Sequence, residues 1–214
     1  MKLYKTKKNC GKLLLGILVF CTGMTLLTGC SSSSEQKQNK HEETAEENKE
    51  EDKVQIGLTV DSFVIERWIR DRDVFVATAR ELGAEVNVQD AGADVKEQIS
   101  QIEYFISKQV DVIVVIARDC GALSDAIQKA QSAGIPVISY DRMVNNANTD
   151  LYISFDNRKV GEIMAQALVN ALPQGGDVFM IQGSSSDNNV RMVKQGFDDM
   201  LADTDLHVVY EANC

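Results

Sequence analysis

The chain has 214 residues, of which 44% are hydrophobic and 25% charged, and its formal net charge is −10. This length and apolar content allow one large or two small packed domains, and the acidic balance argues against nucleic-acid binding, which relies on lysine and arginine contacts to phosphates. Residues 1–29 carry a charge of +5 and no acidic side chain, so removing them lowers the net charge to −15.

The start of the chain has the organisation of a bacterial secretory signal. Several lysines precede an apolar run, residues 13–27, that is short for a membrane span. The sequence Leu27-Thr28-Gly29-Cys30 is similar to a lipobox, so we expect residues 1–29 to be removed and Cys30 to carry a diacylglycerol anchor. The mature protein would then lie at the extracellular face of the cell membrane, or in the periplasm of a cell with an outer membrane. An ordinary signal peptide followed by a coincidental cysteine is the alternative.

Residues 30–53 link this anchor to the rest of the chain. They consist mainly of Ser, Glu, Lys, Gln and Asn, which cannot bury enough apolar surface to fold, so we expect a disordered, flexible tether. One of the two histidines, His41, lies in this tether, and His207 lies in a predicted strand. A histidine-based metal site and a Ser-His-Asp triad are therefore poorly supported, and we expect neither a metal nor another cofactor.

From Val54 onward, short apolar strands alternate with amphipathic helices. This alternation predicts βαβ units and a parallel sheet with helices on both faces. The expected strands are residues 54–60, 84–89, 111–117 and 135–140, and the expected helices are residues 65–82, 95–107 and 122–133. Gly83 and Gly134 are expected to end the first and third helices. The strand order 2-1-3-4 would place the crevice where ligands bind between strands one and three.

A second α/β series follows the polar loop at residues 143–150. Strands are expected at residues 151–156, 177–182 and 206–211, and helices at residues 157–172 and 188–201. We therefore expect a first lobe over residues 54–155 and a second lobe over residues 156–214. So few strands would leave a sheet edge and apolar faces uncovered, so the chain is expected to be an N-terminal fragment or a truncated gene product.

Polar side chains gather at the expected strand ends. Asp141 and Arg142 directly follow the fourth strand, residues 61–63 and 118–120 follow the first and third, and the small polar residues 183–189 follow a strand of the second lobe. A carboxylate and a guanidinium can form charge-assisted hydrogen bonds to hydroxyl groups, and Asn can both donate and accept. Trp68 could lie on the C–H face of a sugar ring. These side chains predict a site for a small neutral polyol, and no glycine-rich phosphate loop follows any strand.

Each of these residues also has a structural interpretation. Asp141 and Arg142 could be a surface pair, and Trp68 could pack beneath the first helix. Asp187 or Asn188 could cap the helix that follows them. The shared position at strand ends favours the ligand-binding interpretation for the group. Cys120 and Cys214 are interpreted as free thiols.

Several motifs resemble those of bacterial periplasmic sugar-binding proteins of the ribose/galactose type, and most closely the members that bind D-xylose. The motifs are Glu66-Arg67-Trp68, Asp71-Arg72-Asp73, Tyr140-Asp141-Arg142-Met143, residues 152–157, Val160-Gly161-Glu162 and Asp187-Asn188-Asn189. The resemblance implies a two-lobed periplasmic binding protein of type I that closes around one pyranose. The sugar contacts that it implies are Arg67, Trp68, Asp141, Arg142, Asp187 and Asn189. Residues 118–120 depart from a more neutral segment of the family, which leaves their role open.

The resemblance further implies a function in sugar uptake, in which the bound monosaccharide, D-xylose or a relative, is delivered to an ABC permease. No bond is made or broken in that function. The alternative is a sensor that docks on a membrane histidine kinase when sugar is bound. An enzyme would need a nucleophile, base or metal constellation, and the sequence shows none.

The lipobox interpretation makes a prediction about the mature N-terminus. Mass spectrometry of the protein purified from membranes should find Cys30 as the first residue, with the added mass of a diacylglycerol group on its thiol. An unmodified N-terminus at any other residue would remove the anchor.

Overall fold

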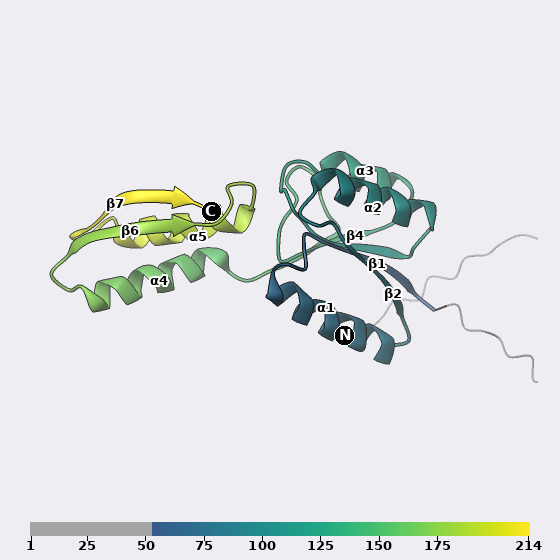
Figure 1. Ribbon diagram of the computed structural model, residues 1–214, viewed down its shortest axis with the longest axis horizontal. Coiled ribbons are helices and arrows are strands. Elements are labelled where there is room, and N and C mark those ends of the chain that lie inside the picture. Colours follow the sequence, from purple (N-terminus) through teal and green to yellow (C-terminus); the bar gives the residue numbers. More distant parts are fainter. Residues whose placement is uncertain (1–52) are drawn as a thin grey trace, which may run out of the picture. The chain divides into compact units, whose positions relative to one another are not determined.

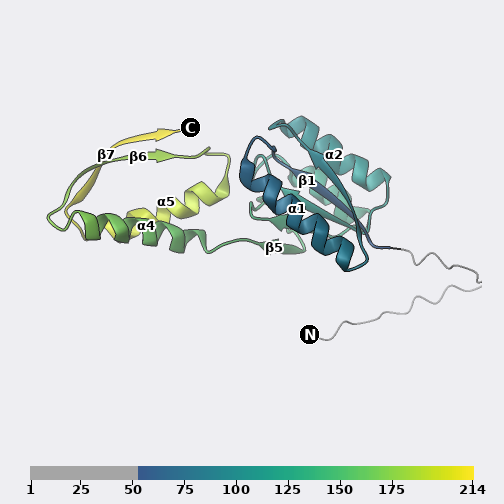
Figure 2. The same cartoon turned by 60° about the horizontal axis from the view of Figure 1, so that its bottom comes forward.

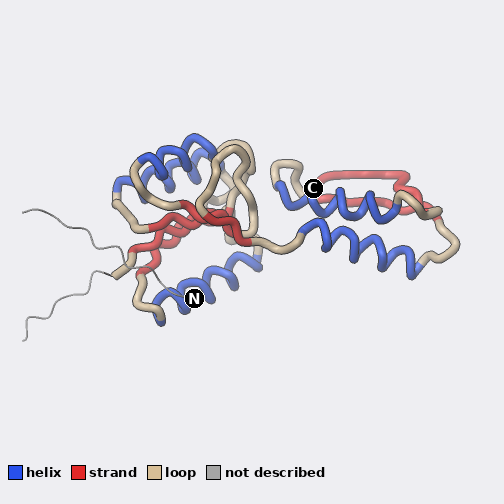
Figure 3. The backbone as a smooth tube through the Cα atoms, turned by 180° about the vertical axis from the view of Figure 1, so that it is seen from behind, coloured by secondary structure: helices blue, strands red, loops and turns tan. Residues whose placement is uncertain are grey.

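The computed structural model describes residues 53–214, which contain two parallel β-sheets with helices packed against them (Figures 1 and 3). The described residues, 53–214, belong to one compact unit. The expected signal segment, the expected lipid attachment at Cys30 and the expected tether up to residue 52 lie outside the described residues. Among residues 53–214, every helix is too short or too polar to cross a lipid bilayer.

The first sheet has five strands in the order β2-β1-β3-β4-β5, and every neighbouring pair is parallel. The strands are β1 (Gln55–Val60), β2 (Glu85–Asp90), β3 (Val112–Ile116), β4 (Val137–Tyr140) and β5 (Leu151–Ile153). The predicted order of the first four strands is confirmed, and β5 adds a fifth strand beside β4. The sheet thus places the ends of β1, β3 and β4 next to one another.

Helices cover both faces of this sheet, with α1 on one face and α2 and α3 on the other (Figures 1 and 2). The helices are α1 (Glu66–Glu81), α2 (Val95–Ser107) and α3 (Ser124–Ser132). The central strand β3 shows the consequence, because Ile113 and Val115 pack in the core beneath α2 and α3, and Val114 and Ile116 pack in the core beneath α1. A strand that is buried on both faces must be apolar throughout, which explains the continuous hydrophobic run.

Several elements are shorter than the sequence predicts, including β5, which ends at Ile153 and not at residue 156, and for α3 and β4 the reasons are local. Helix α3 begins at Ser124 because the Asp119 carboxylate accepts the N–H groups of Gly121, at 2.7 Å, and Ala122, at 3.1 Å, in a preceding turn. Strand β4 begins after Pro136, which has no N–H for the sheet. The N–H of Val137 donates to the Asp150 carboxylate at 2.8 Å, and this hydrogen bond lowers the pKa of Asp150 below its usual value.

The second sheet contains two parallel strands that pack on two helices. These elements are α4 (Asn157–Ala171), β6 (Gly176–Gln182), α5 (Asn188–Leu201) and β7 (Leu206–Asn213). Val178 and Met180 of β6 face a core formed with Ala165 and Phe197 of the helices. Phe179, Ile181 and Tyr210 are exposed, as expected for strands with one uncovered face.

Helices α4 and α5 approach one another so closely that their backbones touch. A Cβ atom at Gly161 of α4 would overlap the carbonyl oxygen of Val193, and one at Gly196 of α5 would overlap the carbonyl oxygen of Arg158. Glycine at these two positions therefore permits a contact that any side chain would prevent.

This contact predicts that Gly161→Ala destabilises the protein. Alanine in an exposed helix position is favoured over glycine by about 0.5–1 kcal/mol, but here overpacking should cost about 1–3 kcal/mol. Urea unfolding of the purified protein measures the difference. Asn170→Ala, at an exposed position of the same helix, is the control and should change stability by less than about 0.5 kcal/mol. A stabilised Gly161→Ala variant would show that the helices are not in backbone contact.

Candidate functional site

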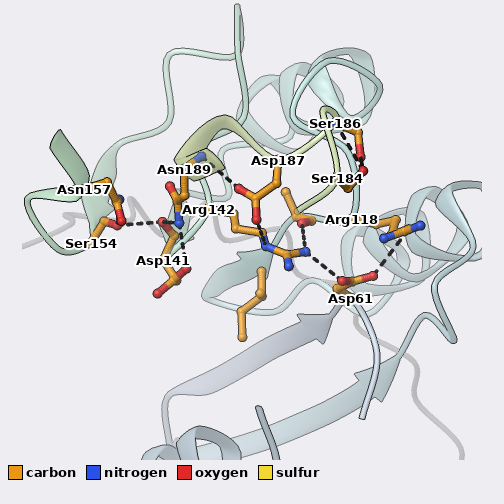
Figure 4. A network of polar contacts seen from close by, with 12 residues as sticks. Asp61, Arg118, Asp141, Arg142, Ser154, Asn157, Ser184, Ser186, Asp187 and Asn189 are labelled. Carbon is orange, nitrogen blue, oxygen red and sulfur yellow. Dashed lines mark hydrogen bonds and ion pairs between the residues drawn. The ribbon is translucent and has the colours of Figure 1, made fainter. Parts of the chain in front are cut away.

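Asp61, Arg118 and the pair Asp141-Arg142 follow β1, β3 and β4, and the parallel pairing of these strands brings them to one edge of the first sheet. Asp187, just before α5, and Asn189, in the first turn of α5, contact them there, and Figure 4 shows the resulting network of polar side chains. Five of the six residues predicted to contact a ligand make polar contacts in this group, namely Arg67, Asp141, Arg142, Asp187 and Asn189, and the sixth, Trp68, packs in the core beside it. Their role in binding stays a prediction.

The backbone of Asp141 is held in an unusual conformation. Its φ angle is +62°, in the left-handed region that Asp tolerates better than most residues. Its N–H donates to Ile153 of β5 at 2.7 Å, and its carbonyl oxygen accepts from the Ser154 hydroxyl at 2.7 Å and the Tyr152 hydroxyl at 3.2 Å. These hydrogen bonds fix the turn after β4 and therefore the direction of the Asp141 side chain.

The Asp141 carboxylate joins two predicted site residues from distant parts of the chain. One oxygen, Oδ1, accepts from Asn189 Nδ2 at 2.9 Å, and the other, Oδ2, accepts from the Arg67 guanidinium. Asn189 Nδ2 also lies 3.2 Å from the Asp141 carbonyl oxygen. Arg67, Asp141 and Asn189 thus point at one another.

Arg142 joins two further carboxylates. Its Nη1 donates to Asp61 Oδ2 at 2.7 Å and to the carbonyl oxygen of Ala117 at 3.2 Å. Its Nε lies 2.8 Å from Asp187 Oδ2, but the N–H does not point along this line, so the contact is an ion pair without a directed hydrogen bond. The guanidinium is consequently held between two acidic groups.

Asp187 caps the helix that follows it and also faces Arg142, while its contact with a ligand stays a prediction. As the N-cap of α5, it accepts the N–H of Asn189 at 2.9 Å on Oδ1. Its other oxygen faces Arg142. The capping interaction orients the carboxylate, since it fixes one oxygen toward the helix and leaves the second for the arginine.

Trp68 is 2% exposed and packs in the core beneath α1. The Arg67 guanidinium lies over its ring at 4.5 Å, and that of Arg142 lies at 5.5 Å from the ring centroid. The interpretation that Trp68 packs beneath the first helix therefore describes this structure. A sugar could stack on the ring only after the Arg67 side chain had moved away.

The six predicted residues omit Asp61, Tyr152 and Ser154, which also belong to this network. Asp61 directly follows β1, and this position at a strand end is the one sequence signal that could have identified it. Tyr152 and Ser154 lie in and just after the short strand β5, within the motif at residues 152–157, but that motif does not show that their hydroxyls contact the Asp141 carbonyl oxygen.

Residues 118–120, whose role the sequence left open, lie beside the network. Arg118 Nε is 3.7 Å from Asp61 Oδ1, and the N–H of Cys120 donates to the Ser186 carbonyl at 3.0 Å. Cys120 is a buried free thiol and Cys214 an exposed one, as predicted.

Tyr140, the last residue of β4, adds a hydroxyl beneath the network. It donates to Asp71 Oδ2 at 3.3 Å. Burial, followed by the nearby Asp71 carboxylate, raises the pKa of Tyr140 above its usual value, so the hydroxyl remains a donor at neutral pH.

Within residues 53–214, no group of three or more His, Cys, Asp or Glu side chains is placed to hold a metal ion.

The cover that Arg67 forms over Trp68 can be tested by fluorescence, because Trp68 is the single tryptophan of the chain. Arg67→Ala should shift the emission to longer wavelength and increase quenching by acrylamide, since the ring becomes accessible to water. Arg70→Ala is the control, because Arg70 pairs with Glu66 on the exposed side of the same helix. Equal quenching of the wild type and Arg67→Ala would mean that Arg67 does not cover the ring in solution.

Comparison with known proteins places this chain in a family. Residues 56–214 match the family described as a periplasmic binding protein domain. The D-xylose-binding periplasmic protein of Escherichia coli (strain K12) is 48% identical over 143 residues, covering 67% of this chain and 43% of that protein. The protein of the same name from Haemophilus influenzae is 44% identical over 160 residues, covering 73% of this chain and 48% of that protein. The chain therefore spans about half the length of these relatives.

A solved structure supports the fold. The solute-binding protein of an ABC transporter from Clostridium phytofermentans, with bound β-D-glucose, has a TM-score of 0.69 and 29% identity, covering 72% of this chain and 51% of that chain. The predicted fold class, parallel sheets flanked by helices as in type I periplasmic binding proteins, is confirmed. Since the family match extends over most of the chain, the protein belongs to the periplasmic binding protein family.

Proposed function

We propose that the protein is an extracellular solute-binding protein that binds D-xylose or a related monosaccharide. The observation that carries the proposal is the meeting of Arg67, Asp141 and Asn189, which come from α1, the end of β4 and α5. A guanidinium, a carboxylate and an amide together offer donors and acceptors for several hydroxyl groups. The two relatives named as D-xylose-binding proteins support xylose as the ligand.

The hydrogen bonds within the site suggest how a sugar would enter it. A hydroxyl group can donate to the Asp141 carboxylate and accept from Arg67 or Asn189, so it can be inserted between them without leaving either side chain unpaired. A ligand without a hydroxyl at that point would separate the groups and leave them unsatisfied, which costs about 1–3 kcal/mol for each buried group. This cost is a basis for selecting among sugars.

We place the binding site between a first lobe of residues 54–155 and a second lobe of residues 156–214. The first lobe contributes Arg67, Trp68, Asp141 and Arg142, and the second contributes Asp187 and Asn189. The bound sugar is delivered to an ABC permease, and the lipid on Cys30 keeps the protein near it. Copurification of a permease from membranes, in contrast to a histidine kinase, distinguishes transport from sensing.

Calorimetry tests the ligand. The protein, produced at its full natural length, is titrated with D-xylose, D-ribose, D-glucose and D-galactose. We expect saturable binding with one site, and the highest affinity for D-xylose. Tighter binding of another of these sugars would overturn the choice of xylose, and no binding of any of them would overturn the sugar-binding function.

Substitution of Asp141 tests the site. Asp141→Asn removes the charge while keeping a side chain that tolerates the left-handed backbone, and it should cost about 1.5–3 kcal/mol of binding free energy, the range for a hydrogen bond to a charged group. This corresponds to a roughly ten- to hundredfold weaker affinity. Asp73→Asn is the control, since Asp73 is exposed and pairs with Arg72. Unchanged affinity of Asp141→Asn would mean that the carboxylate has only a structural role.

A further inference from the structure

We propose that Asp61, at the end of β1, is a positioning residue that orients the Arg142 guanidinium for ligand binding without contacting the ligand itself. The inference rests on the sugar-binding function proposed above. It assigns a role to a residue that none of the recognised motifs contains.

The Asp61 carboxylate is fixed in the first sheet. The side chain is 1% exposed, and the carbonyl oxygen of Asp61 accepts the N–H of Ala93 at 2.8 Å, which ties it to the segment between β2 and α2. A carboxylate this deeply buried is stable only beside a cation. Arg142 Nη1, at 2.7 Å, is the nearer of the two that it faces, and Arg118 Nε is 3.7 Å away.

The contacts of the Arg142 guanidinium show which of its edges is left to meet a ligand. Nη1 donates to Asp61 and to the Ala117 carbonyl, so both of its N–H groups are used. Nε faces Asp187. Among the described residues, the Nη2 group has no hydrogen-bond partner within the protein, which makes it the edge that can meet a hydroxyl group of a ligand.

Asp61 and Asp187 hold Arg142 in different ways. Asp187 is the N-cap of α5, which packs on the second sheet, and its contact with Nε is not a directed hydrogen bond. Asp61 and Arg142 follow β1 and β4 of the same sheet, so their hydrogen bond does not depend on the second lobe. Asp61 therefore orients Arg142 before the ligand arrives, which reduces the side-chain entropy that binding must remove.

Asp61→Asn tests this role because it keeps the shape of the side chain and removes its charge. We expect the affinity for D-xylose to fall about tenfold, as for the loss of one charge-assisted hydrogen bond. Asp90→Asn is the matched control, since Asp90 ends the neighbouring strand β2 and its carboxylate accepts only the N–H of Gly92, at 2.8 Å, among the described residues. It should leave the affinity unchanged.

A double-mutant cycle separates positioning from a general effect on the fold. If Asp61 acts through Arg142, then Asp61→Asn should change the affinity less than twofold in a protein that already carries Arg142→Gln. The double variant removes both charges of the buried pair, so it should fold even where a single variant does not. An equal loss of affinity from Asp61→Asn in both backgrounds would overturn the proposal.

Nuclear magnetic resonance tests the orientation of Arg142 independently of any sugar. In the ¹⁵N-labelled wild type, rotation of the Arg142 Nη groups should be restricted, and Asp61→Asn should remove the restriction. Equally free rotation in both proteins would overturn the positioning role, whether or not sugar binds. If the wild type binds none of the four sugars while the restriction depends on Asp61, the proposed function fails and the orienting contact stands.

Discussion

Strands β1, β3 and β4 run in parallel side by side, so the residues that follow them leave the sheet at the same edge. The rest of the site depends on this constraint. It brings Asp61 within 2.7 Å of Arg142, although the two residues are 81 positions apart in the sequence. A strand order that placed β1 far from β4 would separate the Asp61 carboxylate from the Arg142 guanidinium, and breaking a buried pair of this kind costs several kcal/mol in proteins.

Charge compensation explains how so many ionised side chains can gather in a small volume. Arg142 is balanced by Asp61 and Asp187, and the Asp141 carboxylate by Arg67. The Asp187 and Asp141 carboxylates are also held by the backbone N–H and the side-chain amide of Asn189, so few rotations remain open to them. A site built in this way is arranged before a ligand enters, and the free energy of binding need not include the cost of ordering these side chains.

The same network explains why the aromatic residue is less accessible than its sequence context suggests. Trp68 lies one position after Arg67 on α1, and the helix directs its ring into the core beneath the sheet. The guanidinium groups of Arg67 and Arg142 then cover the ring through cation–π contacts. The tryptophan supports the positions of the two arginines, and through them it influences the polar groups that would meet a ligand.

The sequence by itself determined the alternation of strands and helices, the order of the first four strands and the ends at which the polar residues gather, because these features follow from local periodicity and from the geometry of parallel sheets. Only the tertiary structure decided that Asp61 pairs with Arg142, that Arg67 covers Trp68, and that Asp187 both caps α5 and faces an arginine. Such partners are far apart in the chain, and the direction of each side chain depends on turns and rotamers that no local pattern specifies. The left-handed backbone of Asp141 is one such turn.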